Sequence, residues 1–128
     1  MTSNAAAQRR WAGKNPGCLP AWKAAHPEKV QAATDRATAK RRETRRARRL
    51  AALEMYGGRC ACCGFDDPRA LCIDHVNGDG AARRQPTAEW YRTLLARPRD
   101  PSLQVLCANC NMAKGTGPAC PLEHDKDR

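Results

Sequence analysis

Aromatic and strongly apolar residues are scarce in this sequence. Only 5% of the 128 residues are aromatic, with a single phenylalanine among them, and the mean hydropathy is −0.74. A chain of this composition cannot bury a large apolar core, and small domains of this kind usually need a metal ion or disulfide bonds for stability. We therefore expect at most one compact domain with an extension.

Long apolar segments are also missing. No apolar run reaches the roughly 18 residues that indicate a transmembrane helix, and the N-terminal stretch MTSNAAAQRRWAGK lacks the apolar core of a secretory signal. We therefore expect a cytoplasmic protein without a membrane partner. In a reducing compartment, paired cysteines are interpreted first as metal ligands and only then as disulfides.

Positive charge is abundant but unevenly distributed. Residues 1–50 carry 13 Lys and Arg against 3 Asp and Glu, whereas residues 51–128 carry 10 of each, so the whole formal net charge of +10 lies in the first 50 residues. This predicts a basic arm, residues 1–50, joined to a neutral domain. Such an arm suits nucleic acid, and a solubilising tail is the alternative. The arginines expected to contact nucleic acid are Arg41, Arg42, Arg45, Arg46, Arg48 and Arg49.

Glycine and proline divide the chain into expected elements. Residues 1–26 contain two of each and are predicted to be irregular. The stretch from Pro27 to Tyr56 contains no other proline and no glycine, which favours one long basic helix that ends at Gly57-Gly58. Further along, the sequence predicts strands in LCIDH and SLQVLC, a helix over 86–97 with Trp90 and Leu94 facing the core, a short helix in CANCNMAK, and a polar, frayed tail over 118–128.

The spacing of four cysteines is the strongest signal. Cys60-x-x-Cys63 and Cys107-x-x-Cys110 form two knuckles that offer four thiolates to one structural Zn²⁺. Gly64 permits the tight turn after the first knuckle.

The other four cysteines carry less information. Cys62 competes with Cys63 as a ligand, but the two-residue spacing favours Cys63. Cys72 is expected to be a small buried apolar residue, and Cys18 and Cys120 are uninformative.

An Asp-His pair follows the apolar residues LCI. Adjacent strand residues point to opposite faces, so Asp74 and His75 can face one ligand only if the strand end is distorted. Asn111 directly follows the last predicted zinc ligand, in the first turn of a helix. Oxygen ligands suit a hard cation, so Asp74 and Asn111 are expected to hold one, while His75 takes a proton from a water aimed at a phosphorus.

The segments CACCG, IDHVNGDG and LQVLCANCNMAKG, in this order, resemble His-Me finger nucleases of the HNH type over about residues 55–116. The Cys-x-x-Cys-Asn ending is similar to that of phage members of the recombination endonuclease VII type. The resemblance implies an α+β fold with a small ββα-metal, treble-clef-like core stapled by a zinc site of four cysteines. It also implies His75 as general base and Asp74 and Asn111 as ligands of a catalytic Mg²⁺ or Mn²⁺.

The sequence departs from this family at one position of the HNH pattern. Ser102 stands where the family has the middle Asn, which shapes the loop that holds the histidine. The stretch from Val76 to Leu106 is also long, and its helix is a candidate DNA-contacting insertion.

We expect residues 51–117 to form a DNA endonuclease, a phosphodiester hydrolase acting on double-stranded or branched DNA in a bacterial or phage-infected cell. A unit of this size usually cuts one strand, so double-strand cleavage would need a homodimer or a second event. Further phosphate contacts are predicted from Arg83, Arg84 and Lys114, although Lys114 could instead offset the charge of the zinc site.

Other functions are compatible with parts of the sequence. A non-catalytic zinc module that binds nucleic acid explains the arm and the cysteines, and an interaction adaptor on a basic arm is a further alternative. A zinc deaminase is suggested by HPE at 26–28 and Cys60-x-x-Cys63, but Arg59 stands where that motif requires proline.

Overall fold

The computed structural model describes residues 3–80 and 87–124 of the chain. The chain divides into two compact units, residues 1–42 and 43–128. The division lies inside a helix, so residues 43–50 of the predicted arm belong to the second unit. Among the described residues, no helix is both long enough and apolar enough to span a membrane.

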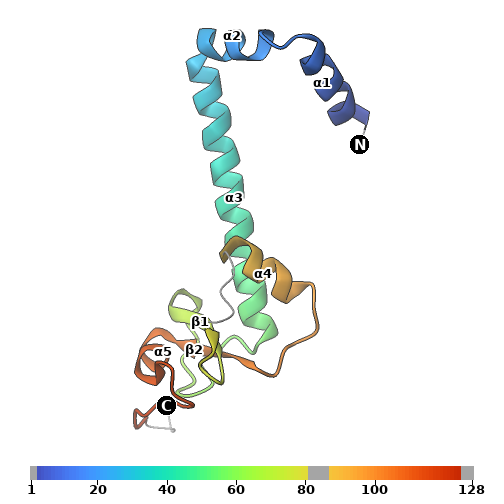
Figure 1. Ribbon diagram of the computed structural model, residues 1–128. Coiled ribbons are helices and arrows are strands. Elements are labelled where there is room, and N and C mark those ends of the chain that lie inside the picture. The colour runs from blue at the N-terminus through green and yellow to red at the C-terminus, as the bar shows by residue number, and fades with distance from the viewer. Residues whose placement is uncertain (1–2, 81–86, 125–128) are drawn as a thin grey trace. The chain divides into compact units, whose positions relative to one another are not determined.

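Two helices occupy the segment that was predicted to be irregular, so that prediction is wrong. Helix α1 spans Ser3–Lys14 and α2 spans Cys18–Ala25 (Figure 1). Pro16 and Gly17 lie in the break between them, and Pro20 lies in the first turn of α2. The first N–H groups of a helix have no intrahelical partner, so proline is tolerated there. The prolines and the glycine thus lie at the boundary between two helices, and they do not indicate that helix is absent.

The long basic helix is confirmed. Helix α3 spans Pro27–Met55. It ends before Gly57 and Gly58, whose φ values of 103° and 67° are accessible mainly to glycine. Near its end, Ala52 and Leu53 are buried, and Tyr56 follows them into the core. The last turns of α3 therefore dock on the second unit.

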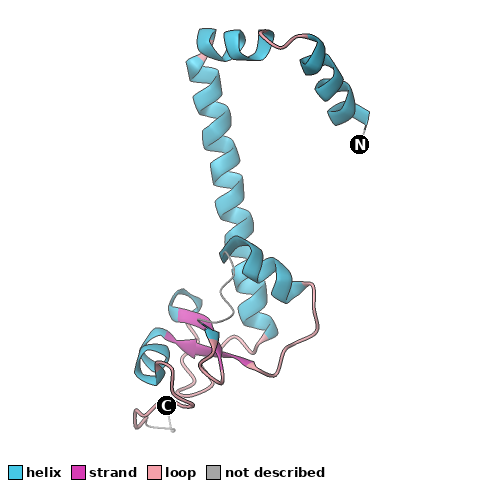
Figure 2. Ribbon diagram, in the orientation of Figure 1, coloured by secondary structure: helices cyan, strands magenta, loops and turns pink. Residues whose placement is uncertain are grey.

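An α+β arrangement forms the second unit, as expected. Strands β1 (Leu71–His75) and β2 (Leu103–Cys107) pair antiparallel, with Leu71 opposite Cys107 and His75 opposite Leu103 (Figure 2). A short 3-10 turn, η1 (Pro68–Ala70), precedes β1. Helix α4 (Thr87–Leu95) lies between the strands in sequence, and α5 (Ala108–Lys114) follows β2 directly. The two strands and two α-helices were each predicted within two residues of their observed bounds, whereas η1 was not predicted.

A small core joins the helices, the sheet and the cysteines. Leu53 from α3, Leu94 from α4 and Val105 from β2 are buried together with Cys60 and Cys110. Trp90 and Tyr91 of α4 pack against this cluster at its edge. Thiols thus form part of the interior of a domain with few large apolar side chains. This is the situation in which a metal ion contributes strongly to folding.

Candidate metal centre and catalytic site

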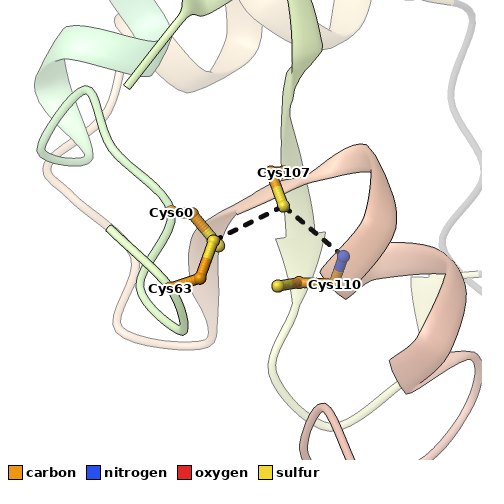
Figure 3. A group of neighbouring side chains, drawn as sticks. All are labelled: Cys60, Cys63, Cys107 and Cys110. Carbon is orange, nitrogen blue, oxygen red and sulfur yellow. Dashed lines mark hydrogen bonds between the residues drawn. The ribbon is translucent and has the colours of Figure 1, made fainter. Parts of the chain in front are cut away.

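Two segments bring four sulfur atoms together. Cys60 and Cys63 lie in the turn after α3, and Cys107 and Cys110 lie at the end of β2 and in the first turn of α5, where their side chains converge (Figure 3). All four sulfurs lie within 4.8 Å of one another, and those of Cys63 and Cys107 are 3.7 Å apart. Ligand sulfurs on a tetrahedral zinc ion are about 3.8 Å apart, given a Zn–S distance of about 2.3 Å. This group can therefore hold a metal ion such as zinc.

Backbone hydrogen bonds set the shape of the first knuckle. The N–H of Gly64 donates to the carbonyl of Cys60 at 2.9 Å, and Gly64 has a φ of 76°, which favours glycine. The N–H of Ala61 donates to the carbonyl of Val105 at 2.8 Å and so ties this knuckle to β2.

The second knuckle caps a helix. The Cys107 sulfur accepts a hydrogen bond from the N–H of Cys110 at 3.5 Å, which gives one of the unpaired amides at the start of α5 a partner. The predicted ligands thus also determine where α5 begins.

The thiols of the cluster differ in acidity. Burial raises the pKa of Cys60, but hydrogen bonds from the backbones of Cys63, Cys107 and Cys62 outweigh burial and lower it to about 7. Burial and the adjacent sulfurs raise the pKa of Cys110 above its ordinary value. Without a cation, four deprotonated sulfurs at this spacing would repel one another in a desolvated site. The site therefore needs a cation if all four are to serve as thiolate ligands.

A second group of metal-ligating atoms adjoins the first. The sulfurs of Cys62, Cys110 and Cys120 and a ring nitrogen of His124 all lie within 4.8 Å of one another. Sequence reasoning correctly preferred Cys63 to Cys62 for the first group, but it treated Cys120 as uninformative and did not consider His124. The three-residue spacing of Cys120 and His124, which resembles that of zinc ligands, was the available signal. The described part of the predicted frayed tail thus turns back to the cysteines.

Asp74 faces α5. Strand β1 stays regular through its last residues, with Asp74 opposite Gln104. The Asp74 Oδ2 accepts a hydrogen bond from Nε2 of Gln104 at 3.0 Å and pairs with Nζ of Lys114 at 3.1 Å. Both contacts use the same carboxylate oxygen.

Lys114 is an interior residue. Its side chain is 1% exposed, and its Nζ also donates to the backbone carbonyl of His75 at 3.0 Å. The prediction that Lys114 contacts nucleic acid is therefore wrong, because the ammonium group is enclosed and already paired. The alternative, compensation of the zinc site, is also incorrect in detail, since the ammonium pairs with Asp74.

His75 faces α4. Its ring stacks on Trp90, with centroids 5.5 Å apart and an interplanar angle of 27°. It also lines a cavity of about 580 Å³ together with Trp90, Arg97 and Asp100. Asp74 and His75 thus lie on opposite faces of β1, as the alternation of a regular strand requires. The end of β1 is regular, so the distortion that would turn both side chains toward one ligand is absent from this strand.

Two further predicted residues lie in α5 and directly before β2. Asn111 is half-buried in the first turn of α5, the helix that supplies Lys114. Ser102 donates from both its N–H and its hydroxyl to Oδ1 of Asp100, at 2.8 and 2.7 Å, and its carbonyl accepts the N–H of Val76 at 2.9 Å. Ser102 therefore fixes the residue directly after His75.

The predicted arginines fall into four groups. Arg49 anchors η1 and β1, because its Nη2 donates to the carbonyls of Pro68 and Leu71 at 2.7 and 2.6 Å. The prediction that Arg49 is free to contact DNA is therefore wrong. Arg48 is half-buried, and Arg83 and Arg84 lie outside the described residues. The solvent-exposed members are Arg41, Arg42, Arg45 and Arg46.

The chain matches no protein-family model, no curated protein and no solved structure.

Proposed function

We propose that this protein is a metal-dependent DNA endonuclease of the HNH type, built on a ββα-metal, treble-clef-like core. The observation that carries the proposal is the order of parts in space. An antiparallel strand pair leads directly into α5, one cysteine knuckle precedes β1 and the other joins β2 to α5, and the Asp-His pair lies at the end of β1, with Asp74 toward α5 and His75 toward α4. This order of parts supports the proposal.

His75 is the proposed general base. Its ring is held against Trp90 and borders the cavity, which leaves room for a water and part of a substrate. Its backbone carbonyl accepts the N–H of Gly78 at 2.9 Å as well as the Lys114 ammonium. The backbone at this position is thus fixed from two directions. A fixed imidazole that takes a proton from a water aimed at phosphorus is the role that this geometry suits.

Asp74 and Asn111 would hold the catalytic Mg²⁺ or Mn²⁺. Bound there, the cation would stabilise negative charge on the phosphate and the leaving oxygen. The donor set fits, because Mg²⁺ usually takes one or two protein oxygens and completes its shell with water and substrate phosphate. The oxygen of Asp74 offered to the cation is Oδ1, since Lys114 and Gln104 both use Oδ2.

The basic arm supports DNA as the substrate, double-stranded or branched. Exposed arginines follow one another along α3 and can neutralise backbone phosphates without reading sequence. We place this activity in the cytoplasm of a bacterial or phage-infected cell. One active site cuts one strand, so a double-strand break would require a homodimer or a second event.

One observation favours a second candidate, a non-catalytic zinc module that binds nucleic acid. The buried Lys114 ammonium neutralises Asp74, the carboxylate that would hold the catalytic cation. In that function the Asp74–Lys114 pair would only fasten α5 to β1.

Plasmid nicking separates the two functions. We expect wild type to convert supercoiled plasmid to open circles with Mg²⁺ or Mn²⁺ but not with EDTA, and His75→Ala to be inactive while still binding DNA. His26→Ala is the matched control, because His26 is a half-buried histidine of the first unit that stacks on Trp22. If wild type binds plasmid, linear duplex and four-way junctions but cuts none of them, the zinc-module function is correct.

A further inference from the structure

We propose that the chain binds two zinc ions that share the thiolate of Cys110. The first ion is held by Cys60, Cys63, Cys107 and Cys110. The second is held by Cys62, Cys110, Cys120 and His124, a set that sequence analysis did not predict.

The distances in the second set suit zinc. The Nε2 atom of His124 lies 3.3 Å from the Cys110 sulfur and 3.6 Å from the Cys120 sulfur. On a tetrahedral zinc ion, a ligand sulfur and a ligand nitrogen are about 3.6 Å apart, given bond lengths of about 2.3 and 2.05 Å. The same ring nitrogen therefore approaches two sulfurs at the spacing that a common ion would impose.

The number of donors also fits two ions. Two four-coordinate ions need eight donor positions, and the two sets offer seven different atoms because Cys110 belongs to both. A thiolate with several lone pairs can bridge two cations, so one shared sulfur completes both shells. Cys110 is the member suited to this role, since it is 0% exposed and its sulfur belongs to both sets.

Charge favours the second ion as well. One zinc ion with four thiolates carries a net charge of −2. Adding Cys62 and Cys120 as thiolates without a second ion would bring this partly buried cluster to −4. A second Zn²⁺ returns the total to −2 while it uses two more thiolates and a neutral imidazole, which lowers the repulsion among desolvated charges.

Cys62 obtains a role from this arrangement. Cys62 and Cys63 are adjacent in a tight turn, and the structure directs them to different sets. The first knuckle thus contributes to both ions, and the second ion fastens the segment around Cys120 to the domain. The described residues 115–124 otherwise contain no helix or strand.

The first experiment measures zinc content. After dialysis against metal-free buffer, we expect two zinc ions per wild-type chain by elemental mass spectrometry and one in His124→Ala and in Cys120→Ser. Cys18→Ser and His26→Ala are the matched controls, because both residues lie in the first unit, and both variants should retain two. Either altered ligand lies outside the core cluster of buried residues, so these variants should still fold around the first ion.

The second experiment tests the shared sulfur in wild type and needs no variant. After substitution with ¹¹³Cd²⁺, we expect two cadmium resonances with a scalar coupling between them, transmitted through the Cys110 sulfur. One resonance, or one zinc ion per wild-type chain, would overturn the second site. Two resonances without coupling would overturn the bridge. Neither readout depends on DNA cleavage, so this inference fails or stands separately from the proposed function.

Discussion

Replacing Lys114 by methionine tests the interior charge pair directly. Methionine keeps most of the length and apolar volume of the lysine stem, so the change removes the ammonium without opening a large cavity. It leaves the Asp74 carboxylate, whose side chain is 11% exposed, with Gln104 as its remaining partner on Oδ2. It also removes the hydrogen bond to the carbonyl of His75, which is 3.0 Å long in wild type.

The expected loss follows from this burial. Removing one partner of a buried ion pair costs about 3–5 kcal/mol, because the other charge stays desolvated and uncompensated. With a urea m value of about 1.5 kcal/mol per molar, the unfolding midpoint should fall by about 2–3 M. Replacing both residues, as in Lys114→Met with Asp74→Leu, should recover most of the loss, since an apolar pair of similar volume is often neutral or stabilising.

Urea unfolding at a fixed, saturating zinc concentration measures this loss. Trp90 reports on the second unit, and Trp11→Phe with Trp22→Phe removes the two tryptophans of the first unit. The double-mutant cycle gives the coupling energy between positions 74 and 114. A loss below about 1 kcal/mol for Lys114→Met, or a coupling energy near zero, would refute the reasoning that this pair is buried and strongly interacting.

Three further changes test other parts of the structure. Cys107→Ser should lose the first zinc ion and unfold the second unit, and a variant that keeps its zinc and its near-ultraviolet circular dichroism would contradict this. Gly80→Ala would place a Cβ 2.8 Å from Nδ1 of His75, so nicking should fall by roughly tenfold or more with little change in the urea midpoint. Arg49→Ala should lower the free energy of unfolding of the second unit by about 1.5–3 kcal/mol with little effect on DNA binding. Arg45→Gln should leave that free energy nearly unchanged but weaken DNA binding, and it should reduce the slope of log binding constant against log salt concentration by about 0.9.

Short-range rules account for what could be predicted from the sequence. Helix α3 has a proline at its start and a glycine pair after its end, and β1 and β2 are apolar runs bounded by turn residues. The two cysteine knuckles have fixed spacing. Each of these features depends on residues close together in the chain, so a single sequence is sufficient to find it.

The features that the sequence did not reveal depend on contacts between distant segments, or on residues such as proline that can either interrupt a helix or lie in its first turn. Lys114 and Arg49 look like ordinary surface cations, and only the folded chain shows that one meets Asp74 and the other meets the carbonyls of Pro68 and Leu71. His124 acquires a role because its segment returns to Cys110. Pro20 was interpreted as a helix breaker, although in the first turn of α2 it is compatible with a helix.

Helix α5 connects the metal site to the charge pair formed by Asp74 and Lys114. It has seven residues, too few for an isolated helix to persist in water, so its stability must come from its surroundings. Cys107 and Cys110 secure its first turn, and Lys114 is its last residue, about one helical turn beyond Cys110. Loss of the metal would therefore release the ammonium from Asp74 without altering either side chain. Metal supply to the cell would then set the electrostatics at the end of β1, although neither member of the charge pair is itself a zinc ligand.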